Sequence, residues 1–160
     1  MSSTFNSGDP VRISFNFYGD QQVDRVLDRI ADNVENATPA FEAIADRFAA
    51  AEQQQFASQG GFGGGGWAPL SPAYAAWKAS RYPGGILVRT GALKGSLTSR
   101  PFGVETISNK QAVFGTAVAY AGYHQSGTSK MPARPPVQLP ESERAQWVKI
   151  MQRFIVTGSV

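Results

Sequence analysis

The feature that most limits the possible folds is a long helical pattern in the first third of the chain. Apolar residues recur every three or four positions over residues 23–34 and again over residues 41–48, which is the spacing of one face of an α-helix. Thr38-Pro39 interrupts the pattern, because proline has no amide hydrogen and disfavours helical geometry at the residue before it. We therefore predict a kinked helix, or two abutting helices, ending near Phe56.

A glycine tract follows this predicted helix. Residues 60–66 read GGFGGGG, and such a segment cannot bury enough surface to offset the entropy lost on ordering. We predict a flexible loop over residues 57–68. The tract also matches G-x-G-x-x-G, but a dinucleotide-binding loop follows a strand and opens a helix, whereas this tract follows a helix and precedes WAPLSP.

Shorter periodic segments complete the expected fold. Strands are predicted at residues 11–18, 86–88, 104–108 and 112–118, and helices at residues 72–80, 92–98 and 141–155. The last two strands form a hairpin across Asn109-Lys110. At 160 residues the chain fits one domain, 1–160. The order of elements indicates an α+β domain, with a mainly antiparallel sheet packed against a long N-terminal helix and a C-terminal helix.

Charge is distributed unevenly along the chain. Residues 1–60 carry nine acidic side chains against four arginines, a net charge of −5, and residues 61–160 carry three acids against eleven basic side chains, a net charge of +8. The asymmetry suits a protein that stacks acidic surface on basic surface, or one that turns a basic face toward nucleic acid. An acidic helix beside loops that happen to be basic would give the same pattern.

Composition also restricts the compartment and the chemistry. No run of 18 apolar residues and no signal-peptide pattern occurs, so we expect a protein that is made and kept in a cytoplasm. The chain has no cysteine, which removes disulfides, thiol nucleophiles and thiolate metal sites.

The only histidine, His124, lies in the sequence YAGYHQSGTSKMPARPP. A serine hydrolase would need a serine, a histidine and an orienting acid. Ser126 is close in sequence, but no G-x-S-x-G elbow is present and the nearest acids along the chain are Glu105 and Glu141. A packed, hydrogen-bonded histidine between two tyrosines is the better interpretation.

Acidic and basic side chains offer two other possible sites. Asp20, Asp24, Asp28 and Asp32 recur every four residues and form an acidic ridge on the first helix. We interpret the ridge as a solvated or docking face, because it lacks the loop geometry of calcium sites. Lys94, Arg100, Lys110 and Lys130 could face DNA phosphates or a lumen, in weak contacts that do not depend on nucleotide sequence. No DNA- or RNA-reading motif is present.

The segment MPARPP predicts an extended path over residues 131–137, because each proline fixes its own φ and restricts the residue before it. We refer to this segment as the proline arm. Arg134 lies between the prolines, and its guanidinium can reach a carboxylate or a carbonyl on a neighbour. We expect replacement of Arg134 by alanine to impair assembly and leave the monomer folded.

Four separated motifs together resemble the phage virion morphogenesis proteins, the Mu-like tail-completion family of tailed bacteriophages. They lie in GGWAPLSPAYAAWKA, GGILVRTGALKGSLTS, VFGTAVAYAG and YHQSGTSKMPARPPVQLPESERAQWVKIM, within about residues 40–156. The resemblance implies architectural or assembly roles for the matching residues, which are Trp67, Leu70, Thr90, Gly91, Leu93, Tyr120, His124, Gln125, Gly127, Pro132, Arg134 and Pro135.

The resemblance further implies a virion structural protein rather than an enzyme, with no cofactor and no metal. Its expected role is that of a tail terminator or tail-completion subunit, which forms a ring, commonly a hexamer in proteins of this kind, that caps the tail tube and docks it to the head connector. Expected partners are other copies of the chain, the tail tube protein, head-completion or connector proteins and, transiently, genome DNA. Another neck component, a head-completion stopper or a connector adaptor, is the alternative.

Overall fold

The computed structural model describes residues 21–160. Its elements are α1 (Gln21–Glu35), α2 (Thr38–Ala57), α3 (Pro72–Arg81), α4 (Ala92–Thr98), β1 (Val104–Ile107), β2 (Ala112–Gly115), α5 (Ala121–Ser126) and α6 (Glu141–Thr157). The two strands pair antiparallel, with Val104 opposite Gly115, and the α+β class is confirmed. The predicted strand at 11–18 lies outside the described residues.

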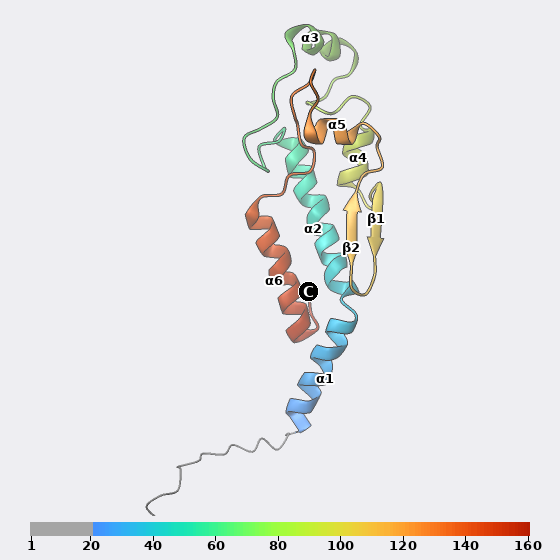
Figure 1. The fold of residues 1–160 in the computed structure, drawn as a ribbon, viewed down its shortest axis with the longest axis vertical. Helices are drawn as coiled ribbons and strands as arrows, with labels where there is room; N and C mark the ends of the chain where they lie inside the picture. The colour runs from blue at the N-terminus through green and yellow to red at the C-terminus, as the bar shows by residue number, and fades with distance from the viewer. Residues whose placement is uncertain (1–20) are drawn as a thin grey trace, which may run out of the picture.

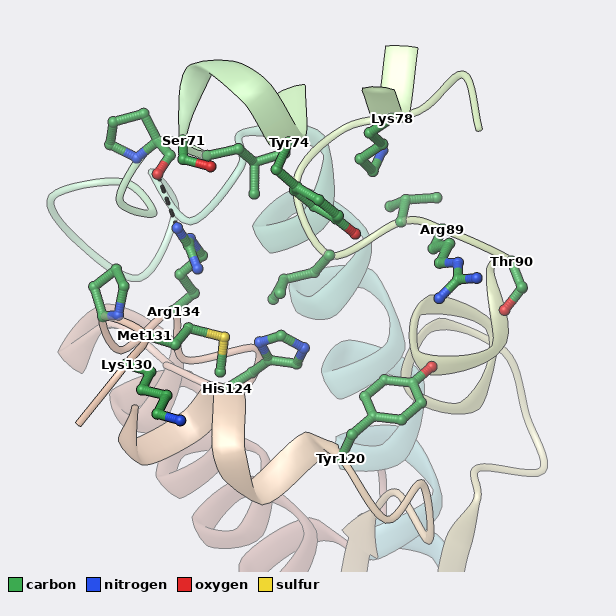
Figure 2. Close-up of a pocket in the computed structure, with 15 residues that line it drawn as sticks. Ser71, Tyr74, Lys78, Arg89, Thr90, Tyr120, His124, Lys130, Met131 and Arg134 are labelled. Carbon is green, nitrogen blue, oxygen red and sulfur yellow. Dashed lines mark hydrogen bonds between the residues drawn. The ribbon is translucent and has the colours of Figure 1, made fainter. Parts of the chain in front are cut away.

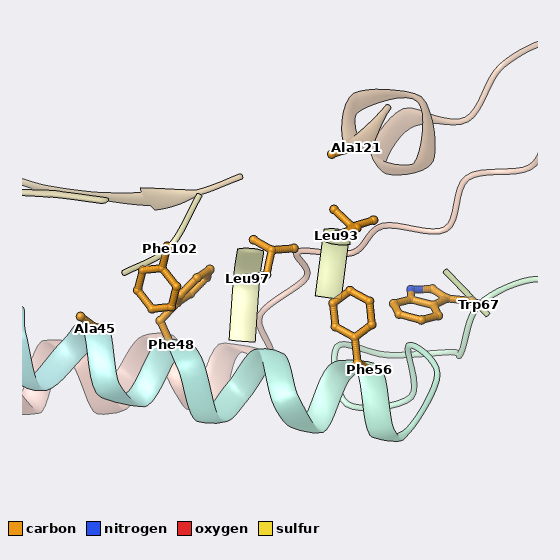
Figure 3. Packing of buried hydrophobic residues seen from close by; sticks show 8 residues of the cluster. All are labelled: Ala45, Phe48, Phe56, Trp67, Leu93, Leu97, Phe102 and Ala121. Carbon is orange, nitrogen blue, oxygen red and sulfur yellow. The ribbon is translucent and has the colours of Figure 1, made fainter. Parts of the chain in front are cut away.

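Helix α2 is the centre of the molecule. It lies between α6 on one side and the β1–β2 hairpin with α4 on the other (Figure 1). Phe48 of α2 packs edge-on against Phe102 at 5.0 Å between ring centroids and stacks on Phe114 at 5.7 Å. Farther along α2, Phe56 meets Trp67 in the same buried cluster (Figure 3). Burial of each such side chain stabilises the fold by about 2 kcal/mol. Helix α2 therefore joins the part of the core around Phe48 to the part around Phe56.

The break between α1 and α2 occurs where proline predicts it, and the two abutting helices are confirmed. The hairpin turn fixes the break, because the amide of Ala37 donates to the carbonyl of Asn109 at 2.9 Å. Lys110 next to it pairs with Glu35 at 2.7 Å. The predicted turn residues, Asn109 and Lys110, therefore hold the end of α1 in place and also connect the two strands of the hairpin.

Helix α1 is tied to the rest of the chain through its last turn. The side-chain amide of Asn33 donates to the carbonyls of Phe154 and Ile155 at the end of α6, both at 3.1 Å. The rest of α1 extends away from the body (Figure 1), and none of its residues is buried. We call the apolar face of this helix the α1 stripe, which comprises Val23, Val26, Leu27, Ile30 and Val34.

Three details differ from the sequence predictions. Residues 86–88 form a turn rather than a strand, with Val88 donating to the carbonyl of Gly85 and Leu87 at φ +62°. No described strand lies beside them, so their side chains pack on the core instead. Strand β2 ends at Gly115 and not at residue 118. The short helix α5 was not predicted.

The first half of the glycine tract is packed against the molecule. Gln55 accepts from the amide of Gly60 through its carbonyl and from the amide of Gly63 through its side chain, both at 2.8 Å. A Cβ at Gly63 would lie 2.2 Å from the carbonyl oxygen of Gln138, so only glycine fits there. Around Gly65 an added Cβ would meet nothing within 4 Å. Flexibility of residues 57–68 stays a prediction.

Glu52 is the unusual group of the core. It is completely buried on α2, and neither of its carboxylate oxygens has a hydrogen-bond partner in the described chain. Burial raises the pKa of Glu52 to about 8, because a carboxylate without partners is costly away from water. The side chain is therefore protonated at neutral pH.

The buried carboxyl makes stability depend on pH. Because its folded pKa lies above the unfolded value, the protein loses stability as the pH rises toward about 8. We expect the free energy of unfolding to fall by on the order of 4 kcal/mol between pH 5 and pH 9. Glu52→Gln should remove most of this slope, as measured by urea unfolding at several pH values. An unchanged slope in the variant would mean that Glu52 is ionised in the fold.

Candidate functional site

A cavity of about 870 Å³ opens at the end of the molecule that carries α3. Helix α3 and the loop after it form one wall, and α5 with the start of the proline arm forms the other (Figure 2). Its apolar surface comes from side chains such as Leu70, Leu87, Val88 and Met131. The volume lies in the range of ligand-binding sites and exceeds what one side chain fills.

All four sequence motifs meet at this cavity. Leu70 comes from the first motif, Thr90 from the second and Tyr120 from the third. The fourth motif supplies His124, Pro132 and Arg134. Residues that are far apart in the sequence therefore line one surface, although spacing along the chain gives no sign of this.

Arg134 holds the two walls together. Its guanidinium donates from Nε to the carbonyl of Ala68 at 2.6 Å and from Nη2 to the carbonyl of Pro69 at 2.8 Å. The side chain is only 6% exposed. The sequence predicted a carboxylate or carbonyl partner on a neighbour. The structure shows carbonyls of the same chain. The expectation that Arg134→Ala leaves the monomer folded stays a prediction, and loss of these two bonds should lower the stability of that monomer.

Trp67 and Pro135 form a second tie beside the first. The carbonyl of Pro135 accepts from the indole Nε1 of Trp67 at 2.8 Å and from the side-chain amide of Gln55 at 3.3 Å. Gln55 is the residue that also holds the glycine tract. The proline arm, the tract and the end of α2 thus form one hydrogen-bonded unit.

His124 lies on α5 and faces the cavity (Figure 2). Its ring meets Tyr120 edge-on at 5.9 Å, and its Nδ1 has no hydrogen-bond partner in the described chain. Packing is as predicted, whereas the expected hydrogen bond is absent at Nδ1. Burial and then the charge of Arg134 lower the pKa of His124, so the ring is neutral at neutral pH.

Two further motif residues shape the turn after α5. The side-chain amide of Gln125 donates to the carbonyl of Val137 at 2.9 Å and accepts from its amide at 3.3 Å. Gly127 has φ +73°, and a Cβ there would lie 2.7 Å from the amide nitrogen of Ala133. This close approach requires glycine and folds the proline arm back onto α5.

The second motif builds α4. Gly91 precedes the helix at φ +84°, Thr90 accepts from the amide of Ala92, and Leu93 is buried in the core. The hydroxyl oxygens of Ser96 and Thr116, which belongs to the third motif, are hydrogen-bonded at 2.7 Å. These contacts connect the second motif to the core and to the third motif.

The cavity is cationic. Lys78, which is 5% exposed, donates to the carbonyls of Tyr82, Gly84 and Gly85 at 3.3, 2.7 and 3.1 Å. Arg89 lies over the rings of Tyr82 and Trp77, 4.9 and 5.8 Å from their centroids. Lys130 and Arg134 also line the space, and no acidic side chain does among the described residues.

The four basic residues predicted to face DNA or a lumen have different surroundings in the described structure. Arg100 pairs with Glu42, with Asp46 at 2.9 Å and with Glu105 at 2.6 Å. Lys110 pairs with Glu35. Lys94 is exposed on α4, and Lys130 lies at the cavity. The ion pairs leave Arg100 and Lys110 with little net charge for a phosphate.

The arrangement offers little catalytic chemistry. Ser126 lies two residues after His124 on the same helix, and residues at that spacing do not face each other. The cavity provides no carboxylate from the described residues to orient the histidine. Within the described residues no group of three or more acids and histidines could hold a metal ion. The described lining of the cavity therefore offers no group to orient His124 as a general base.

Comparison with known proteins agrees with the motif resemblance. The model of the phage virion morphogenesis family matches residues 19–153. The chain belongs to this family. Neither a curated protein nor a solved structure gives a match.

Family membership makes the chain a bacteriophage virion morphogenesis protein, which implies association with the virion. None of the helices described here is both long and apolar enough to cross a membrane.

Sequence reasoning missed several residues of the cavity. Tyr74, Lys78 and Arg89 line it and were not singled out as site residues. A usable signal was present, because α3 and the loop after it carry Tyr74, Trp77, Arg81, Tyr82 and Arg89 without an acid. Tryptophan, tyrosine and arginine are the residues enriched at binding hot spots.

The contacts of Arg134 give a stability prediction. Arg134→Ala removes two charge-assisted hydrogen bonds and leaves two carbonyls without this donor, so we expect a loss of about 2–4 kcal/mol. Arg134→Lys should lose less stability, because the ammonium group of lysine keeps the positive charge, although it lacks the planar guanidinium. Urea unfolding measures both, with the exposed Arg144→Ala as control, for which we expect a change within about 0.5 kcal/mol. Equal stability of Arg134→Ala and Arg144→Ala would contradict this role.

Proposed function

We propose that this virion morphogenesis protein is a tail-completion or tail-terminator subunit that forms a ring, with six subunits as the expected number, at the head–tail junction. The ring caps the tail tube and docks it to the head connector. In this role the protein is structural and catalyses no reaction. The proposal rests on family membership and on the surfaces that the fold leaves open.

The observation that carries the proposal is the exposed α1 stripe. Val26, Leu27 and Val34 are 42%, 57% and 46% exposed, although their spacing is that of a buried helical face. A contiguous apolar face on a projecting helix marks a surface for another protein. A subunit that is completed by its neighbours needs such a face, whereas a free enzyme does not.

The position of the protein in the particle is the direct test. An epitope tag placed after Val160, which is 52% exposed, and detected with gold in negative-stain images should label the head–tail junction. Label at the junction together with capture of purified tube protein supports a terminator. Capture of the portal alone would indicate a stopper or adaptor, and particles without label would contradict the proposal.

The α1 stripe gives a second test. Val26→Asp with Leu27→Asp places two carboxylates in the proposed contact, where desolvation without a partner is unfavourable. We expect the number of joined particles to fall by on the order of tenfold. Gln152→Asp, at an exposed site on α6, is the control, and thermal unfolding verifies that both variants fold. Normal yield from the stripe variant would show that the stripe is not an assembly contact.

A further inference from the structure

The cavity and the α1 stripe have complementary properties. The cavity is an apolar space lined by four cationic side chains, Lys78, Arg89, Lys130 and Arg134, and by no acid among the described residues. The helix has an apolar stripe on one side, and Asp24, Asp28 and Asp32 form an exposed ridge on the other side, next to Arg25 and Arg29, so that the acids exceed the arginines by one. The described lining of the cavity has basic side chains and no acid, and α1 provides acidic side chains.

The positive charge of the cavity is not cancelled inside the described part of the subunit. The hydrogen-bond partners of Lys78 and Arg134 are carbonyl oxygens, which are dipoles and carry no net charge. Arg89 interacts with aromatic rings and with the hydroxyl of Tyr82. Arg100, in contrast, is surrounded by three carboxylates. The fold therefore neutralises one basic site and leaves the cavity positive.

The two surfaces of one subunit cannot meet. The cavity lies at the end of the molecule that carries α3, and α1 projects from the opposite end (Figure 1). Asn33 fixes the last turn of α1 to the end of α6, so the helix cannot fold back along the body. An α1 helix that occupies the cavity must therefore come from another copy.

We infer that α1 of one copy docks at the cationic cavity of the next copy, with its apolar stripe toward Leu70, Tyr74 and Met131 and its acidic ridge toward Arg89 and Lys130. The contact is heterologous, because different surfaces of the two subunits meet. Such a contact closes into a ring when the rotation per subunit allows it. The inference rests on the proposed function and specifies the contact between subunits.

The absence of cysteine from the chain allows a direct test by thiol cross-linking in phage particles. Leu27→Cys with Tyr74→Cys places thiols on two exposed positions, one on each surface. A short bis-maleimide should then produce a ladder of linked subunits in purified particles. The matched control is Leu27→Cys with Thr106→Cys, whose second thiol lies on the hairpin, and it should give several-fold less product.

Charge reversal tests the complementarity. Asp24→Lys with Asp28→Lys on α1, or Arg89→Glu with Lys130→Glu at the cavity, should each lower the yield of the ladder several-fold. The combination of all four changes should restore it to within about twofold, because opposite charges again face each other.

Each other outcome has a defined meaning. Tagged protein at the head–tail junction without a ladder would overturn the inference and leave the proposed function standing. Cross-linking of the Leu27→Cys single variant to itself would mean that α1 packs on α1, and would also overturn it. Loss of the ladder after nuclease treatment would mean that DNA occupies the cavity and bridges the copies, which would overturn the direct contact. Absence of the protein from particles would overturn the proposed function and the inference together.

Discussion

The candidate site depends on hydrogen bonds to three backbone carbonyls, those of residues 68, 69 and 135. Arg134 donates to the first two, and Trp67 and Gln55 donate to the third. These bonds connect the end of α2 and the segment after the glycine tract to the proline arm, which is far away in the sequence. Without them the two walls of the cavity would have no fixed distance, because loops are held by hydrogen bonds rather than by their own packing.

The same contacts explain the electrostatics of the site. A buried cation is usually paired with an acid, and Arg100 on the outer surface has three. At the cavity, carbonyl dipoles take this place for Lys78 and Arg134, so the cations are satisfied as donors while their charge persists. The pKa of His124 is lowered first by burial and then by the charge of Arg134. The second cause is consistent with a positive electric field from Arg134 that extends into the cavity. A neutral histidine adds no charge of its own at neutral pH.

Much of the fold was predictable from the sequence, because long periodic segments bury a whole face. The stripe of α2, the proline at its start, the hairpin turn and the final helix all predicted correct elements. The short segments at 86–88 and in α5 were not predictable, since tertiary contacts decide their conformation. Motif residues such as Arg134 and Trp67 could be named from the sequence, but their convergence on one cavity depends on the path of the whole chain.

The polarity of the molecule limits how copies can associate. A two-fold contact through the cavity would bring two sets of cations together. This arrangement places like charges side by side, which disfavours it. A head-to-tail contact pairs opposite charges at every junction and uses each surface once.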